Sequence, residues 1–166
     1  MINAVSIFLA CVIFFGETGE DWMKDRAWHS MTDEQRYEAS IDLKARAVGM
    51  TTEEFDLMSR VVYAESDRSS FEGMVLIALV LFNRVEDSRF EDTITDVCYE
   101  SGQFQVVENG AIWSAGRTNQ SDWAIIEAER RIADYNAPKV LYFNCEGYSS
   151  WNEDYCYVGG NYFSLG

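Results

Sequence analysis

Histidine is nearly absent from this chain: His29 is its single copy among 166 residues. A Ser-His-Asp or Cys-His enzyme would have to depend on that residue, which argues against nucleophilic catalysis of these kinds. The sequence also has no P-loop, no GxGxxG and no HExxH motif, so the usual signatures of nucleotide, dinucleotide and zinc-protease sites are missing. We therefore expect chemistry that uses no cofactor and no metal ion.

Basic residues are scarce as well, with 13 Lys and Arg against 28 Asp and Glu and a formal net charge of −15. This excess of negative charge argues against a nucleic acid as partner and disfavours adhesion to anionic lipid surfaces. Proline occurs once, whereas aromatic residues reach 14%. A chain of this length can bury a sizeable core, and nothing in the sequence indicates its oligomeric state.

The chain has no apolar run of about 20 residues, the length that spans a bilayer. Residues 4–16, AVSIFLACVIFFG, have the size of a signal-peptide core, but no Lys or Arg precedes them and no A-x-A cleavage site follows. We expect an export signal or an uncleaved anchor here; the alternative is a first helix packed into the core. The protein would then be extracytoplasmic, and it would contact a membrane only through this segment.

Cysteine occurs four times, and two copies, Cys145 and Cys156, lie in a loop-like stretch with ten residues between them. In an exported protein they can form a disulfide, which would contribute about 3 kcal/mol by closing a loop of that size. A structural zinc site needs closely spaced ligand pairs, which this spacing lacks. Free thiols in a reducing compartment are the other alternative.

One carboxylate, Glu65, interrupts an apolar helical pattern. The pattern begins at Thr51 and Glu54, which are spaced as in a capping box, and its apolar face carries Phe55, Met58 and Val62. Glu65 is the next position on that face. Two interpretations are open. Glu65 is turned to solvent or paired with Arg68 or Arg84, as is usual for Glu. Alternatively, it is held against apolar walls, which raise its pKa and make it a general acid.

A second helix is predicted from about Phe71 to Val85. It contains nine consecutive apolar residues, Met74 to Phe82, so apolar side chains cover all sides of the helix. A helix of this kind is buried in the protein interior. The polar elbow ESDRSS separates it from the helix that ends at Glu65.

Several short motifs of the chain, in this order, resemble the SleB/CwlJ cell-wall hydrolase family, which includes spore-cortex lytic enzymes and phage proteins. They are Ala64-Glu65-Ser66, Glu72-Gly73-Met74, Asn83-Arg84-Val85, Phe90, Thr93-Ile94, Val97 and Gln103-Phe104, with two closing motifs at residues 140–144 and 158–163. The resemblance covers residues 55 to 166 and implies an α+β, mostly α, lysozyme-like domain with a minor β element near the C-terminus. It also leaves a phage origin open.

The resemblance further implies a peptidoglycan lytic transglycosylase with Glu65 as the single acid/base. The substrate would be the glycan strand, cleaved between N-acetylmuramic acid and N-acetylglucosamine. If the outcome is hydrolysis instead, a second carboxylate is needed, and Asp67 is the candidate. A non-catalytic peptidoglycan-binding or virion structural module of the same fold is the alternative.

Four residues are predicted to bind substrate through the same resemblance. Gln103 would hold an acetamido group and Phe104 would stack on a sugar face; alternatively Phe104 belongs to the core and Gln103 to a turn. Tyr142 and Asn144 would line the opposite wall, or form a plain edge strand. Asn83 and Arg84 are expected to be structural. The chain departs from the family pattern at Ser69, Met74 and Asn161, which puts substrate-binding detail in doubt.

The rest of the chain predicts further elements. They are a helix from a capping box at Thr32 to about Ala47, a short helix at Ile94–Tyr99, a helix capped by Ser121 and ending near Tyr135, and strands at Lys139–Asn144 and Val158–Phe163. Gly102, Gly110 and Gly116 punctuate a long loop that we take as a wall of the substrate groove. We expect an apolar N-terminal segment (1–16), an extension with a helix (17–50) and a catalytic domain (51–166).

Overall fold

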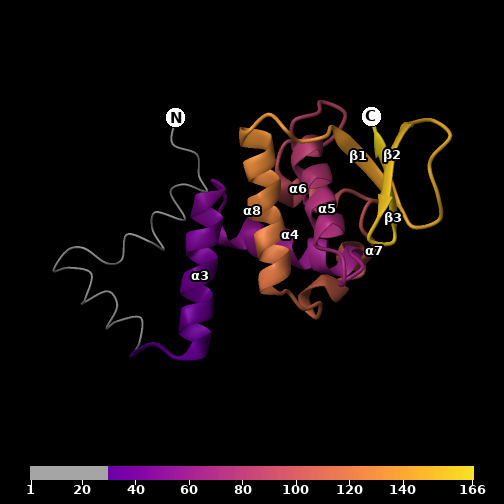
Figure 1. Ribbon diagram of the computed structural model, residues 1–166. Coiled ribbons are helices and arrows are strands. Elements are labelled where there is room, and N and C mark those ends of the chain that lie inside the picture. Colours follow the sequence, from indigo (N-terminus) through magenta and orange to yellow (C-terminus); the bar gives the residue numbers. More distant parts are fainter. Residues whose placement is uncertain (1–29) are drawn as a thin grey trace.

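Helices dominate the chain in the computed structural model, which describes residues 30–166, and a small sheet follows them (Figure 1). The elements are α3 (Asp33–Ala47), α4 (Thr52–Glu65), α5 (Phe71–Val85), α6 (Ile94–Tyr99), α7 (Gln105–Glu108), the 3-10 helix η1 (Ala111–Trp113), α8 (Asn119–Ala133), β1 (Val140–Asn144), β2 (Glu153–Val158) and β3 (Asn161–Leu165). The expected mostly α architecture with a minor β element is confirmed. The apolar run at residues 4–16 lies outside the described residues.

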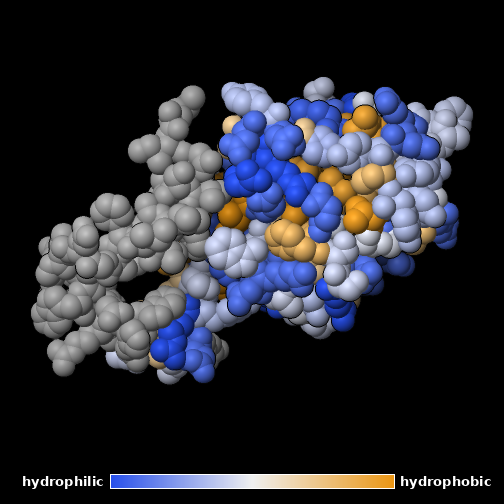
Figure 2. Space-filling model, in the orientation of Figure 1, coloured by the Kyte–Doolittle hydropathy of each residue, from blue (hydrophilic) through white to orange (hydrophobic). Residues whose placement is uncertain are grey.

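Helix α5 is the centre of the domain. It contacts α4, α6, α8 and β1, and Figure 1 shows it between α8 and the sheet. Every residue from Gly73 to Leu81 is buried, as its unbroken apolar sequence predicts. Burial of each large aliphatic side chain contributes roughly 1.5–3 kcal/mol, so this helix holds most of the other elements to the core. In the coloured part of Figure 2, hydrophilic residues predominate and hydrophobic patches lie between them.

The end of α5 is bonded to the first strand of the sheet. The Asn83 side-chain amide donates to the carbonyls of Pro138 (3.0 Å) and Val140 (2.8 Å), and Arg84 Nε donates to the carbonyl of Leu141 (2.9 Å). Both side chains are almost fully buried, and these bonds satisfy the Asn83 amide and Arg84 Nε, which would otherwise be costly in the core. The structural role predicted for Asn83 and Arg84 is confirmed.

The sheet has three antiparallel strands in the order β1-β3-β2. A strand was predicted across Val158–Phe163, but the chain turns inside that range. Gly159 and Gly160 have φ of +58° and +79°, and they connect the paired residues Val158 and Asn161. Two positive φ values are what a two-residue hairpin turn of type I′ requires, and the Gly-Gly dipeptide was its signal in the sequence.

The predicted disulfide between Cys145 and Cys156 is wrong for this fold, because both residues are free thiols. Cys145 follows the last residue of β1, whereas Cys156 lies in β2 opposite Phe163 of β3. Since β3 separates the other two strands, their backbones are about 9.5 Å apart. A disulfide bridges Cα atoms no more than about 7 Å apart.

Two predictions for residues 100–135 also need correction. The predicted loop contains α7 and η1, which bury Val107 and Ile112. The N-cap of α8 is Thr118, and Ser121 is the third residue of the helix, whose side chain completes the capping box. Serine is a common N-cap residue, but here Thr118, three residues earlier, has the extended backbone conformation that an N-cap needs.

Helix α3 is joined to the rest of the domain through apolar and charged contacts. The predicted capping box at Thr32 and the stop at Gly49 (φ +72°) are both present. Ile41 and Ala45 belong to the core cluster. The division of the chain at residue 51 stays a prediction. None of the helices within residues 30–166 is long and apolar enough to cross a membrane.

A buried carboxylate, Asp122 of α8, ties α3 to the domain. Its Oδ2 lies 2.7 Å from Lys44 Nζ of α3 and 3.2 Å from Arg117 Nη2, and its Oδ1 accepts a hydrogen bond from Ser59 Oγ of α4. Asp122 is fully buried and the side chains of the two cations are at most 5% exposed. Three helical segments therefore meet at one charge cluster.

We expect Asp122→Ala to destabilise the protein by about 3–5 kcal/mol, because it leaves two buried cations without their shared anion. Asp33→Ala is the matched control: Asp33 pairs with Arg36 but is 98% exposed, and removing such a pair costs about 0–1 kcal/mol. Urea unfolding of both variants measures the difference. Equal losses would contradict the role assigned to the buried cluster.

Candidate active site

Glu65 is the last residue of α4, as predicted from its place after Phe55, Met58 and Val62 on the apolar face. The capping box of Thr51 and Glu54 is present at the start of α4, and Phe55, Met58 and Val62 are fully buried. Glu65 itself is half-buried. Its carboxyl group therefore lies at the boundary between the core and solvent.

Burial raises the pKa of Glu65 above its ordinary value, and desolvation is the cause. Within residues 30–166 no cation pairs with this carboxylate: Arg84 bonds to the backbone of β1, and the guanidinium of Arg68 lies 4.6 Å from the ring of Tyr63. The ion pair considered for Glu65 is thus excluded in the described part of the chain. A carboxyl group with a raised pKa keeps its proton to higher pH, as a general acid must.

The elbow between α4 and α5 carries the other carboxylate considered for catalysis, Asp67. Its side chain is exposed and accepts hydrogen bonds from the backbone N–H (3.1 Å) and hydroxyl (3.0 Å) of Ser69. Ser70 then caps α5 by accepting from the N–H of Gly73. Asp67 therefore shapes the turn, and among residues 30–166 its side chain bonds only within the elbow.

The β2–β3 turn packs directly against this elbow. The Asn161 side-chain amide donates to the backbone carbonyl of Glu65 (3.1 Å), and the N–H of Asp67 donates to the carbonyl of Gly159 (3.4 Å). A Cβ atom on Gly73 would lie 3.2 Å from the Cα of Gly159. The two backbones therefore approach as closely as glycine allows, and this contact fixes the backbone of Glu65 beside the tip of the hairpin.

The segment between α6 and α8 lies along the other side of α4, since α7 and η1 both contact that helix. Gly116 sits over the ring of Tyr63, where a Cβ atom would be 3.3 Å from the ring carbon Cε1. Tyr63 is two residues before Glu65, so this contact brings the segment to the same end of α4. Its role as a wall of the groove stays a prediction.

The structure contradicts a stacking role for Phe104, because this residue is 1% exposed. Its ring lies 6.3 Å from that of Phe143, which in turn lies 5.9 Å from Phe163. Phe104 is therefore part of an aromatic cluster in the core and cannot reach a sugar. Gln103 is exposed on a turn, and its substrate role stays a prediction.

The two predicted residues of β1 differ in environment. Tyr142 is half-buried, with its ring 6.0 Å from that of Phe90 and 5.9 Å from the guanidinium of Arg84. Asn144 is exposed, and its side-chain oxygen accepts from the N–H of Glu146 at 2.7 Å. Neither side chain has a described contact with Glu65, so their substrate roles stay predictions.

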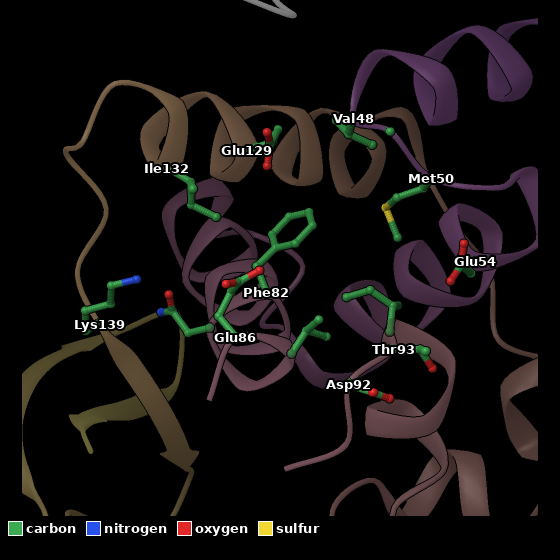
Figure 3. Close-up of a pocket in the computed structure, with 14 residues that line it drawn as sticks. Val48, Met50, Glu54, Phe82, Glu86, Asp92, Thr93, Glu129, Ile132 and Lys139 are labelled. Atoms are coloured by element: carbon green, nitrogen blue, oxygen red, sulfur yellow. The ribbon is translucent and has the colours of Figure 1, made fainter. Parts of the chain in front are cut away.

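A separate pocket of about 600 Å³ lies at the opposite end of α4. Phe82 points into it from α5, and Glu54, Glu86, Asp92 and Glu129 are among the residues around it (Figure 3). Glu54 and Glu65 are eleven positions apart, which is about 16 Å along a helix. Burial raises the pKa of Glu129, but no described contact links this pocket to Glu65, and we do not assign the active site to it.

Sequence reasoning missed the structural contacts of three residues near Glu65. Asn161 was noted only as a departure from the family pattern, although its amide holds the end of α4. Gly159 was read as part of a strand, although the Gly-Gly pair signals a turn. Tyr63, which contacts the 100–118 segment, had no signal apart from its place two residues before Glu65.

The chain resembles known proteins over most of this region. Residues 68–163 match the Cell Wall Hydrolase family. The spore cortex-lytic enzyme of Oceanobacillus iheyensis is 35% identical over 65 residues, which are 39% of this chain and 24% of that enzyme. The spore cortex-lytic enzyme of Halalkalibacterium halodurans is 34% identical over 83 residues, or 49% and 25% of the two chains. The chain thus spans about a quarter of the length of the curated relatives it matches.

Two solved structures share the fold. The catalytic domain of the germination-specific lytic transglycosylase SleB from Bacillus anthracis superposes with a TM-score of 0.58 at 25% identity, covering 70% of this chain and 97% of that domain. The catalytic domain of the Bacillus cereus SleB protein gives a TM-score of 0.58 at 26% identity, covering 70% and 92%. The expected lysozyme-like fold and the predicted family resemblance are confirmed.

The raised pKa of Glu65 predicts a pH-dependent stability difference. The folded state holds this proton more tightly than the unfolded state, so wild-type stability falls as pH rises from the ordinary Glu pKa of about 4.3 through the folded-state value. Glu65→Gln has no proton to lose there. We expect the free energy of unfolding of the mutant, relative to wild type, to increase as pH rises between these two pKa values, as measured by urea unfolding at a series of pH values. A difference that stays constant with pH would contradict this prediction.

Because Gly73 lies so close to the hairpin, replacing it by alanine is expected to lower the stability of the protein instead of raising it. Alanine inside a helix ordinarily stabilises by about 0.5–1 kcal/mol relative to glycine. At position 73 the added methyl group meets both the Ser70 side chain and the backbone of Gly159, so we expect Gly73→Ala to destabilise by about 1–3 kcal/mol, as overpacking does. Thermal unfolding measures this. Ser69→Ala, in the elbow but without that contact, is the control for local disturbance; a stabilised Gly73→Ala variant would refute the packing argument.

Proposed function

Because the chain belongs to the cell wall hydrolase family, we propose that it cleaves the glycan strands of peptidoglycan, with Glu65 as its single acid/base. The observation that carries this proposal is the environment of Glu65: a half-buried carboxyl group with a raised pKa and no cation partner in the described chain. Such a group is protonated at higher pH than an exposed one, so it can donate a proton to a leaving group.

The proposed reaction breaks the bond between N-acetylmuramic acid and N-acetylglucosamine. Glu65 donates its proton to the bridging oxygen, and that oxygen leaves with the bonding electron pair as the hydroxyl of N-acetylglucosamine. The resulting carboxylate then takes the proton of the muramyl 6-hydroxyl, whose oxygen closes onto C1 to form a 1,6-anhydro ring. Glu65 ends protonated again, so the cycle needs no water and no second carboxylate.

The neighbourhood of Glu65 supports an intramolecular reaction over hydrolysis. A hydrolytic glycosidase positions a second carboxylate across the sugar, about 5–9.5 Å from the first. The candidate, Asp67, is exposed and bonded within its own elbow. The lytic transglycosylase activity named for the solved Bacillus anthracis domain is consistent with the one-carboxylate scheme. Since peptidoglycan lies outside the membrane, the proposal also places the protein in an extracytoplasmic compartment.

We expect Glu65→Gln to lose turnover by at least 10²–10⁴-fold, which is about what general acid–base catalysis contributes, while the protein still binds glycan strands. Asp67→Asn should lose far less. Wild-type activity should fall as pH rises through the folded-state pKa of Glu65, because the ionised form cannot donate. Release of soluble fragments from purified peptidoglycan measures all three.

Mass spectrometry of the fragments separates the alternatives. Anhydromuramyl ends are the expected product, reducing muramyl ends would indicate hydrolysis, and binding without release would indicate a non-catalytic module. An active Glu65→Gln protein, or equal losses in the Glu65 and Asp67 variants, would overturn the one-carboxylate mechanism.

A further inference from the structure

The C-terminal part of the chain exposes a group of aromatic side chains that the proposed reaction does not use. Tyr148, Trp151, Tyr155 and Tyr157 are 38%, 92%, 45% and 59% exposed, within ten residues of one another. Exposed aromatic residues in a group of this kind indicate a binding surface more often than single ones do. The loop between β1 and β2 and the hairpin that follows it carry all four.

Two of these residues, Tyr148 and Tyr157, form a continuous ring cluster with Tyr162. Tyr157 of β2 and Tyr162 of β3 are directly paired across the hairpin, with ring centroids 4.5 Å apart. The ring of Tyr148, from the preceding loop, meets Tyr162 edge-on at 4.9 Å. We call these three residues the tyrosine platform.

The platform lies on the face of the sheet that points away from the core. Cys156 and Val158 of β2 and Phe163 of β3 pack against the hydrophobic core. Because successive side chains of a strand point to opposite faces, Tyr157 and Tyr162, which alternate with these residues, lie on the outer face. Asn144 of β1 is paired with Tyr162, which places its polar side chain at the edge of the platform.

The charges around the platform restrict what it can bind. Residues 145–166 contain Glu146, Glu153 and Asp154 but no Lys or Arg. A polyanion such as a nucleic acid or an anionic lipid surface needs basic residues to neutralise its charge, so neither fits. Uncharged sugar rings present an apolar C–H face to an aromatic ring and hydroxyls at the edge, which matches the apolar body and polar tip of tyrosine.

The platform and the proposed active site share one hairpin. Tyr162 directly follows Asn161, whose amide holds the carbonyl of Glu65. The turn that joins the platform strands is the same turn that packs on the elbow through Gly159 and Asp67. The hairpin therefore carries the platform on its outer face and contacts the end of α4 through Asn161 and the turn.

We propose that the tyrosine platform binds N-acetylated sugar units of the glycan strand beyond the linkage that is cleaved. This proposal rests on the proposed function for its substrate. It adds a sugar-binding surface, formed by Tyr148, Tyr157 and Tyr162, that holds the polymer while Glu65 acts on it. Binding of this kind lowers KM for long strands and leaves kcat unchanged, because it acts equally in the ground state and the transition state.

The test compares Tyr157→Ala, Tyr148→Ala and Tyr157→Phe in the full chain. The two alanine variants should each bind a soluble N-acetylglucosamine hexamer and insoluble peptidoglycan roughly three- to tenfold more weakly, as expected for the loss of an aromatic contact, and should raise KM for the polymer with little change in kcat. Tyr157→Phe should bind within about twofold of wild type, since it keeps the ring. Tyr135→Ala is the matched control, because Tyr135 follows α8 and is 97% exposed.

Titration of the hexamer and sedimentation with peptidoglycan, both done in the Glu65→Gln background to prevent cleavage, measure binding. Wild-type-like binding by both alanine variants, with their folding confirmed by circular dichroism, would overturn the platform and would leave a protein-docking role for this face. If Tyr157→Ala weakens binding but Glu65→Gln still cleaves, the platform stands and the one-carboxylate mechanism fails. The two proposals can therefore fail separately.

Discussion

Burial of α5 on all sides is the constraint on which the rest of the structure depends. Because no face of this helix can meet water, α4, α6, α8 and β1 must all cover it. Its two ends then fix the sheet: Asn83 and Arg84 bond to the backbone at β1, and Gly73 admits the turn of the β2–β3 hairpin. The position of Glu65 relative to that turn is thus a consequence of packing around one apolar helix.

The two carboxylates Asp122 and Glu65 have opposite electrostatic environments. Asp122 is fully buried but shares two cations and a hydroxyl, so its charge holds helices together. Glu65 is less buried and has no such partners within residues 30–166, so burial works against its charge. The first arrangement stabilises the fold, whereas at the second site ionisation costs stability as pH rises. The same carboxylate chemistry therefore has opposite energetic consequences at the two sites.

The helices were predictable from the sequence because their signals are local. The features that were not predicted depend on packing between residues far apart in the chain. The capping boxes at Thr32 and Thr51, the unbroken apolar run of α5 and the stop at Gly49 depend on neighbours within a few residues. By contrast, the burial of Phe104 depends on Phe143, and the separation of Cys145 from Cys156 depends on a strand that comes later in the chain. The contact of Asn161 with Glu65 joins residues 96 positions apart. Periodicity and motif spacing carry no information about such pairs. The position of Glu65 at the end of a helix was therefore predictable, whereas the residues that contact it were not.

The order β1-β3-β2 also affects when the site can form during synthesis. The two outer strands have no hydrogen bonds to each other and can pair only with β3, which leaves the ribosome after both of them. Asn161, at the start of β3, is likewise the side chain that anchors the end of α4. A nascent chain that stops short of β3 has neither the sheet nor the hydrogen bond that anchors the end of α4. The surroundings of the proposed acid/base are therefore completed by β3, the last of the three strands to be synthesised.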